Sequence, residues 1–332
     1  MSGRIAINGF GRIGRGVLRA LLEQSSDLEL VAINDLTDGA ALAQLFNFDS
    51  VYGRAATRMH VEGDELVVGD RRIKIIAERD PAKLPWGELG IDVVLESTGR
   101  FTKAADARQH LEAGARRVLV SAPSSGSDVT LVRGVNEDAY LPNSHFVISN
   151  ASCTTNALAP LAQVLHQLAE IEQGFMMTVH AYTQDQSLVD GPHSDPRRAR
   201  AAALNIVPSS TGAARAIGKV LPELDGKLNG DSIRVPVPVG SIVELTAVVG
   251  RDVTVEEVRA AYREAAEGRL KGILEYSEDP LVSSDIVGNP ASSVFDSELV
   301  RVDGRLVKVS SWYDNEWGFS NRVAETLAKL AS

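Results

Sequence analysis

The segment Ile5-Ala6-Ile7-Asn8-Gly9-Phe10-Gly11-Arg12-Ile13-Gly14 decides the fold of this chain. A short apolar run ends at a G-x-G-x-x-G pattern, and apolar residues then recur at helical spacing through residues 17–22. A second strand candidate, residues 28–33, ends at Asn34-Asp35. Strand, glycine turn, helix and strand make a βαβ unit, which is the context in which this glycine pattern binds a dinucleotide.

The glycines allow the backbone to approach a pyrophosphate, which binds at a helix N-terminus because free N–H groups and the helix dipole favour anions there. Asp35 follows about 20 residues after the last glycine, where an acidic side chain meets the adenosine ribose. A carboxylate at that point repels the 2′-phosphate of NADP, so NAD is the expected cofactor. The alternatives are a glycine turn without a ligand and an Asp35 that only caps a turn. The residues that this motif places at the cofactor are Gly9, Gly11, Gly14 and Asp35.

Further strand-like runs at residues 93–95, 118–120 and 146–148 alternate with helical segments, which indicates a parallel, doubly wound sheet. The pattern changes near residue 150. A helix follows Cys153, an apolar strand at residues 175–179 ends at His180, and a polar, basic loop covers residues 183–200. We therefore predict an α/β chain, with a Rossmann-type doubly wound parallel sheet in residues 1–152 and an α+β catalytic domain with a mixed or antiparallel sheet in residues 153–315.

Composition excludes several classes of partner. The 332 residues are 44% hydrophobic, and 44 acidic against 34 basic residues give a net charge of −10, which argues against nucleic acid and anionic membrane surfaces. We expect no membrane span and no secretory signal, because the chain lacks the apolar stretches that these need. The one cysteine allows no internal disulfide and no cysteine-cluster metal site, so we expect a cytoplasmic protein without a metal.

Cys153 lies in Asn150-Ala151-Ser152-Cys153-Thr154-Thr155-Asn156, between a strand and a helix. The N-terminal end of a helix lowers a thiol pKa and favours the nucleophilic thiolate, although an inert buried cysteine is the plain alternative. Among the six histidines, most occupy positions typical of an ordinary surface, whereas His180 ends an apolar strand. His180 is a candidate general base, and a structural histidine is the alternative.

Basic residues suggest anion binding. Arg197, Arg198 and Arg200 cluster in the polar loop, and Arg234 precedes a Val-Pro repeat. Ser209-Ser210-Thr211-Gly212 opens the next helical segment, a favourable place for a phosphate. A solvated charged face would look similar, but two anion-sized sites would suit a phosphorylated substrate together with inorganic phosphate.

Over essentially its whole length the chain resembles phosphorylating glyceraldehyde-3-phosphate dehydrogenase. The motifs that carry the resemblance are Ile7 to Arg15, Asn150 to Asn156, Ser209 to Ala213, and Trp312-Tyr313-Asp314-Asn315-Glu316. The resemblance implies oxidation of glyceraldehyde 3-phosphate to 1,3-bisphosphoglycerate with NAD and inorganic phosphate, in glycolysis or gluconeogenesis, through a hemithioacetal and a thioester. It also implies a homotetramer with the polar loop near its centre, and a C-terminal helix, residues 316–332, that packs back onto the nucleotide-binding domain.

The resemblance assigns roles to particular residues. Cys153 would be the nucleophile and His180 its base. The expected NAD contacts are Arg12, Ile13, Asp35, Arg79, Ser121 and Asn315. The expected phosphate contacts are Thr183, Arg198 and Arg234 for the substrate, and Ser152, Thr154, Thr211 and Gly212 for inorganic phosphate.

Two positions and one segment depart from the common family pattern: Ala157 replaces a second cysteine, Phe319 a tyrosine, and Val237-Pro238-Val239-Gly240 a Thr-Pro-Asn-Val segment. Two alternatives stay open beside the main prediction. One is an erythrose-4-phosphate dehydrogenase, which this chain also resembles. The other is a nucleotide-binding scaffold or sensor without turnover, against which the presence of Cys153, His180 and the phosphate-site residues argues.

Overall fold

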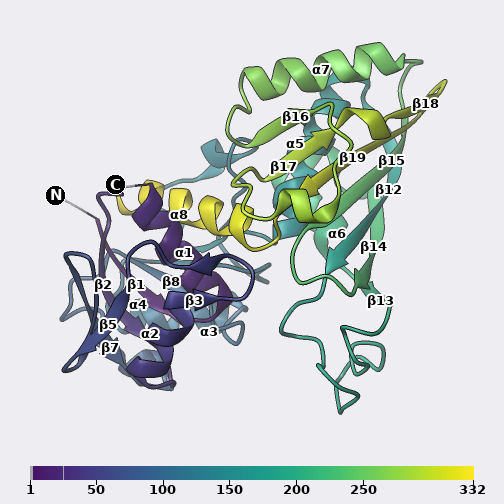
Figure 1. The fold of residues 1–332 in the computed structure, drawn as a ribbon. Coiled ribbons are helices and arrows are strands. Elements are labelled where there is room, and N and C mark those ends of the chain that lie inside the picture. The colour runs from purple at the N-terminus through teal and green to yellow at the C-terminus, as the bar shows by residue number, and fades with distance from the viewer. Residues whose placement is uncertain (1–2, 25) are drawn as a thin grey trace. The chain divides into compact units, whose positions relative to one another are not determined.

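The computed structural model describes residues 3–24 and 26–332, so Met1 and Ser2, where the expected nucleotide-binding domain begins, lie outside the described residues. The chain divides into two compact units. The nucleotide-binding unit comprises residues 1–131, 138–151 and 320–332, and the catalytic unit comprises residues 132–137 and 152–319. Each unit has a sheet of its own (Figure 1).

The nucleotide-binding unit is built on a nine-stranded sheet within the described residues. In spatial order its strands are β10 (Val129–Thr130), β11 (Val147–Ser149), β9 (Arg117–Val120), β8 (Val93–Glu96), β1 (Arg4–Asn8), β2 (Glu29–Asn34), β7 (Arg71–Ile76), β6 (Glu65–Val68) and β5 (Met59–Glu62). Pairing is parallel from β10 to β7, and β6 and β5 add an antiparallel edge. The parallel strands are apolar because both faces of such a sheet are covered.

The strand order reverses its direction of winding at β1. From β1 the chain continues outward through β2 and β7 on one side, and it later returns to place β8, β9 and β11 on the other side. In open α/β sheets, ligands bind at the carboxyl ends of the strands beside such a switch point. The loops after β1 and β8 therefore lie at the expected dinucleotide site.

The first helix begins directly after the glycine turn. Val17, Leu18 and Leu21 recur on one face of this helix and are fully buried. This first helix is α1 (Arg12–Glu23), and the other helices and short elements of this unit are α2 (Gly39–Asn47), α3 (Ala104–Ala107), α4 (Gln109–Glu112), the hairpin β3 (Phe48–Asp49) and β4 (Gly53–Arg54), and the 3₁₀ turn η1 (Pro81–Lys83). The 3₁₀ turn η2 (Glu137–Ala139) begins in the catalytic unit and ends in this one. The last helix, α8 (Trp317–Ala331), contributes residues 320–331 to this unit.

The catalytic unit has a mixed sheet of eight strands within the described residues. They are β13 (Val207–Ser210), β14 (Leu228–Val235), β12 (Ile171–Ala181), β15 (Ser241–Val249), β19 (Leu306–Tyr313), β17 (Ser293–Asp296), β16 (Leu274–Ser277) and β18 (Arg301–Asp303), which pairs with β19. The pairs β12–β14 and β16–β17 are parallel, and the others are antiparallel. Buried and half-exposed residues alternate along β15, as expected for a sheet with only one face fully covered.

Helices cover one face of this sheet. α5 (Cys153–Ala169) packs on β15, β17 and β19, and it lies beside α6 (Ala213–Val220) and α7 (Val255–Glu267) (Figure 1). A capping box at Thr254 and Glu257 begins α7, because each residue supplies the hydrogen bond that the other's backbone lacks. The short 3₁₀ turns here are η3 (Pro222–Leu224), η4 (Ser283–Ile286) and η5 (Ser297–Leu299).

The predicted fold class is confirmed: a Rossmann-type sheet is joined in sequence to a unit with a mixed sheet. One of the helical segments expected between the strand-like runs, the segment that contains Ala104, Ala107 and Leu111, is two short helices, α3 and α4. His180 lies inside β12 rather than at its end, because the strand continues to Ala181 beside β14. No helix in the described part of the chain is both long enough and apolar enough to cross a membrane.

Candidate active site

Cys153 is the first residue of α5, and the turn before it is unusually shaped. Ala151 has a φ of 57°, a left-handed conformation that non-glycine residues rarely adopt. Ser152 caps the helix, since its side chain accepts a hydrogen bond of 3.1 Å from the backbone N–H of Thr155. This hydrogen bond caps the first turn of α5. It holds the thiol at the N-terminal, positive end of a helix of 17 residues.

His180 approaches the thiol from the neighbouring strand β12. Its Nε2 lies 3.4 Å from Cys153 Sγ, and its Nδ1 lies 2.7 Å from the backbone oxygen of Ala181. A carbonyl oxygen only accepts, so the proton of a neutral imidazole sits on Nδ1 and leaves Nε2 free to accept the thiol proton. His180 is 3% exposed and meets the ring of Tyr313 edge-on. The structure therefore brings a thiol and a correctly oriented base together.

Arg234 is the nearest cation to this pair. Its Nη1 lies 3.1 Å from His180 Nδ1, and it donates to the Ala181 oxygen at 3.1 Å and to Thr183 Oγ1 at 2.9 Å. Burial, with the charge of Arg234 as a second cause, lowers the pKa of His180 to about 3. Since Nδ1 carries a proton, the contact with Nη1 joins two donors and acts through charge.

The expected lowering of the thiol pKa by the helix N-terminus is not what the structure shows. Burial raises the pKa of the Cys153 thiol above its ordinary value, and the charge of Arg234 and hydrogen bonds from Thr154 only partly oppose this. Desolvation therefore outweighs the helix end. Burial disfavours both the thiolate and the imidazolium, so these pKa shifts favour a neutral thiol beside a neutral imidazole, with the two atoms 3.4 Å apart.

Three further polar residues lie around Arg198 in the long loop. Arg198 pairs with Asp185, donates from Nε to Ser209 Oγ at 3.2 Å, and donates from Nη2 to the oxygen of Ser210 at 3.3 Å. Asp185 also accepts a hydrogen bond from Thr183. One connected cluster is thus formed by Thr183, Arg198 and Arg234. In this cluster the Asp185 carboxylate contacts Thr183 and Arg198, two of the donors that were expected to hold a phosphate.

The four residues expected at the inorganic phosphate lie at two helix starts. Ser152 and Thr154 begin α5, and Thr211 and Gly212 precede α6. Gly212 is the N-cap of α6 and has open space where a side chain would be. Thr154 is engaged elsewhere, because its Oγ1 lies 2.9 Å from the hydroxyl of Tyr313.

The glycine turn of the nucleotide-binding unit fits a dinucleotide. A side chain on Gly9, whose φ is +95°, would meet the backbone nitrogen of Thr98 at 2.7 Å, and one on Gly14 would meet the oxygen of Gly9 at 2.4 Å. At Gly11 a Cβ would have no neighbour within 4 Å, so the backbone is open to a ligand there. Tight turn, open approach and close helix packing are the three roles that this fingerprint requires.

The other expected cofactor residues differ in their surroundings. Asp35 accepts from the backbone N–H groups of Phe10 and Thr37, so it stands beside the glycine turn. Arg12 pairs with Asp49 at 2.6 Å. The remaining three expected residues of the nucleotide-binding unit are Ile13, in the first turn of α1, Arg79, which is exposed, and Ser121, which bonds to the oxygen of Glu96.

Asn315 belongs to the catalytic unit and is connected to His180 through Ser241. Asn315 Oδ1 accepts from Ser241 Oγ at 3.0 Å, and Ser241 Oγ accepts from the N–H of Ala181 at 3.1 Å. The Ala181 oxygen in turn fixes the His180 tautomer. Asn315 Oδ1 also accepts from Gly240 N at 3.2 Å, which fixes the orientation of the amide.

Sequence reasoning missed Asp185, Ser241 and Tyr313 as parts of this site. Asp185 stands two residues after Thr183, a spacing that could have drawn attention to it. Ser241 and Tyr313 are register partners on β15 and β19, and only the strand pairing reveals their position. The structure explains the last residue of the departure at residues 237–240. Gly240 has a φ of +94°, and a Cβ at this position would meet the backbone oxygen of Ser283 at 2.3 Å, so the position requires glycine. Nothing in the structure explains Phe319 or Ala157 beyond their burial.

Within the described residues, no group of three or more histidine, cysteine or acidic side chains is placed to hold a metal ion. The features on which the chemistry of this chain rests are the Cys153–His180 pair and the dinucleotide-binding turn. The class that these features define is that of dinucleotide-dependent enzymes with a nucleophilic thiol.

Comparison with known proteins identifies the family. Residues 3–104 match the glyceraldehyde 3-phosphate dehydrogenase NAD binding domain, and residues 152–315 match the C-terminal domain of the same family. The chain is 70% identical over 329 residues to glyceraldehyde-3-phosphate dehydrogenase of Kitasatospora aureofaciens, covering 99% of both chains. It is also 57% identical to glyceraldehyde-3-phosphate dehydrogenase of Geobacillus stearothermophilus, over 100% of this chain and 99% of that relative. The chain belongs to the glyceraldehyde-3-phosphate dehydrogenase family.

Proposed function

We propose that this chain oxidises glyceraldehyde 3-phosphate to 1,3-bisphosphoglycerate with NAD and inorganic phosphate, with Cys153 as the nucleophile and His180 as its base. The observation that carries the proposal is the 3.4 Å contact between Cys153 Sγ and His180 Nε2. Membership of the family supports the reaction and the cofactor. NAD, when bound, supplies the acceptor for the hydride that leaves the aldehyde carbon.

The side chains of the catalytic unit divide the work. His180 Nε2 takes the thiol proton as Cys153 sulfur bonds to the aldehyde carbon, and it passes this proton to the aldehyde oxygen, which gives a hemithioacetal and leaves His180 neutral again. His180 then takes the hydroxyl proton as hydride departs, and a thioester on Cys153 remains. An oxygen of inorganic phosphate attacks the thioester carbon, the C–S bond breaks, and the acyl phosphate leaves with Cys153 restored. The thioester conserves the oxidation energy, so no ATP is needed.

Arginines hold the two phosphates in this proposal. Arg234 and Thr183 form one donor group and Arg198 another, and guanidinium groups bind phosphate oxygens with strong, directional hydrogen bonds. Ser152, Thr154, Thr211 and Gly212 complete the inorganic phosphate site. Asp185 would have to leave Arg198 before a phosphate binds there, because two anions cannot share the same donors without repulsion.

We also propose a cytoplasmic homotetramer. Between β12 and β13, Leu188 and Leu204 are 80% and 83% exposed and Val189 and Ile206 are exposed as well, as is Phe175 in β12. Several large apolar side chains exposed in one part of the sequence favour a protein–protein contact. Light scattering of the purified chain should give four chain masses. A nucleophilic free thiol also suits a reducing compartment.

The test is NADH formation with glyceraldehyde 3-phosphate, with and without inorganic phosphate. Sustained turnover only when phosphate is present supports the proposal. Sustained turnover without phosphate would exclude the phosphorylating reaction, and a preference for erythrose 4-phosphate would reassign the substrate. A chain that binds NAD and turns over neither aldehyde would be a scaffold.

A further inference from the structure

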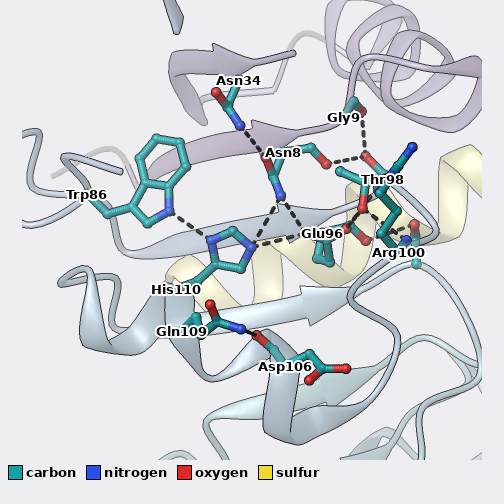
Figure 2. Close-up of polar contacts among 12 residues, drawn as sticks. Asn8, Gly9, Asn34, Trp86, Glu96, Thr98, Arg100, Asp106, Gln109 and His110 are labelled. Atoms are coloured by element: carbon teal, nitrogen blue, oxygen red, sulfur yellow. Dashed lines mark hydrogen bonds and ion pairs between the residues drawn. The ribbon is translucent and has the colours of Figure 1, made fainter. Parts of the chain in front are cut away.

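A buried polar cluster lies at the switch point of the nucleotide-binding sheet, and the proposed reaction makes no use of it (Figure 2). Asn8 ends β1, and its register partners Glu96 and Asn34 end β8 and β2. Trp86 and His110 complete what we call the switch-point cluster. His110 is 0% exposed and Glu96 2%, so the expectation that most histidines other than His180 sit at ordinary surface positions was wrong for His110.

Glu96 is the hub of the cluster. Its Oε2 accepts from Asn8 Nδ2 at 2.6 Å and from His110 Nε2 at 3.0 Å. Its Oε1 accepts from the backbone N–H of Thr98 at 2.9 Å and from the Thr98 hydroxyl at 2.5 Å. Four donors satisfy the two oxygens of an ionised carboxylate, which is what allows this group to be buried.

The hydrogen bond from Trp86 determines the tautomer of His110. The indole N–H can only donate, and it lies 3.0 Å from His110 Nδ1. Nδ1 must therefore accept, and the proton of a neutral His110 sits on Nε2, where it is donated to Glu96. Asn8 Nδ2 and His110 Nε2 lie 3.3 Å apart as two donors that converge on the same carboxylate oxygen.

The two loops that leave the sheet at the switch point are held together by this carboxylate. Through Asn8 the cluster holds the residue before Gly9, and through Thr98 it holds the loop after β8. These loops touch: the Ser97 hydroxyl donates to the oxygen of Gly9 at 2.7 Å, and a Cβ on Gly9 would meet Thr98 N at 2.7 Å. The shape of the glycine turn therefore depends on where Glu96 is held.

We propose that Trp86 and His110 are positioning residues for dinucleotide binding, which hold Glu96 so that the Gly9 turn and the Thr98 loop keep the spacing that the nucleotide needs. This inference rests on the proposed NAD-dependent function. Loss of the indole donor leaves the buried Nδ1 of His110 without its partner, so the ring is no longer held in place against Glu96. The two loops must then be ordered at the moment of binding, which weakens NAD binding.

Trp86→Phe tests the proposal, because it removes the donor and keeps an aromatic ring. Calorimetric titration should show a dissociation constant for NAD about tenfold higher than in the wild type, an effect of the size that one unpaired buried hydrogen-bond acceptor causes. The kcat at saturating NAD should stay within about twofold, since the catalytic unit is untouched.

Tyr262→Phe is the matched control: it removes a fully buried aromatic donor, 2.5 Å from the oxygen of Leu161, in the catalytic unit. Its affinity for NAD should equal that of the wild type.

A second pair of variants tests whether the hydrogen bonds of Glu96, rather than its packing, support NAD binding. This pair also tests the proposal if Trp86→Phe does not fold. In Glu96→Gln, an amide donor faces Asn8 and His110, so NAD affinity should fall about tenfold or more. Adding Asn8→Asp exchanges the places of carboxylate and amide: the new carboxylate can accept from Gln at 96, from His110 and from Asn34, whose Nδ2 lies 2.7 Å from Asn8 Oδ1. The double variant should regain most of the lost affinity.

Two results would overturn the inference: wild-type NAD affinity in folded Trp86→Phe, even with a lowered unfolding temperature, or a double variant that binds NAD no better than Glu96→Gln. Wild-type protein that does not bind NAD would instead refute the proposed function. The titrations therefore distinguish failure of the inference from failure of the function on which it rests.

Discussion

His180 and Arg234 are register partners on the parallel strands β12 and β14, and the guanidinium Nη1 of Arg234 lies 3.1 Å from Nδ1 of the imidazole. The same arginine also donates to Thr183. One side chain thus joins the proposed phosphate site to the proposed base. Its charge is one reason why His180 stays neutral, and an anion bound to Arg234 would reduce that effect.

His180→Asn should slow acylation by about 10²–10⁴-fold, the usual contribution of a general base, with unchanged NAD affinity. The variant should also change the alkylation of Cys153 by iodoacetate. Burial raises the pKa of this thiol, so without its partner it should be almost wholly protonated at neutral pH and become reactive only as the pH rises through the alkaline range. Wild-type protein should react faster at pH 7. Identical pH profiles of alkylation in both proteins, with equal turnover, would make His180 structural.

Arg234→Ala should raise the KM for glyceraldehyde 3-phosphate far more than the KM for unphosphorylated glyceraldehyde, because only the former offers a phosphate to the guanidinium. Arg234→Lys is the matched control, since it keeps the charge but loses the forked donor geometry. Its KM for glyceraldehyde 3-phosphate should lie between those of the wild type and Arg234→Ala. Steady-state kinetics with both aldehydes measure this. An equal change in KM for the two substrates would argue against a phosphate contact.

Asp35→Ala should lose much of the preference for NAD over NADP. In its proposed place at the adenosine ribose, the Asp35 carboxylate repels the 2′-phosphate of NADP, and no lysine or arginine follows in Leu36-Thr37-Asp38. Specificity constants for both cofactors in both proteins give the answer. Equal use of NAD and NADP by the wild type would contradict the cofactor preference, and an unchanged preference in the variant would remove Asp35 from that role.

Ser241→Ala should lower kcat by about tenfold, because it removes the hydroxyl that links Asn315 to the backbone of Ala181 and leaves a buried N–H without its acceptor. Ser232→Ala is a suitable control. Ser232 is equally buried, but its hydroxyl has no hydrogen-bond partner among the described residues. Turnover at saturating substrates should distinguish the variants, and similar kcat values in both would mean that the link through Ser241 has no part in catalysis.

Sequence reasoning reached the features that depend on local pattern. The glycine turn needs particular residues at fixed spacing, and it places Gly9, Gly11 and Gly14 where the structure has them. Partnerships across strands depend on register, which no local pattern reveals. That is why the Trp86–His110–Glu96 chain and the Ser241 link went unforeseen.

The error over the thiol has a different cause. Sequence placed Cys153 at the start of a helix, and the structure agrees. The expectation of a lowered pKa considered the helix end alone, whereas the sign depends on how deeply α5 buries the sulfur. Burial is a property of the packed unit, and a motif of seven residues does not contain it.

The central claim is that oxidation passes through an acyl group on Cys153, and intact-protein mass spectrometry measures this most directly. Wild-type protein mixed with glyceraldehyde 3-phosphate and NAD, without inorganic phosphate, should form one NADH per chain and gain the mass of one phosphoglyceryl group, mapped to Cys153. Addition of inorganic phosphate should remove the added mass and start continuous turnover. Cys153→Ser should show neither event. Turnover without an acylated Cys153, or a serine variant that works like the wild type, would contradict the account.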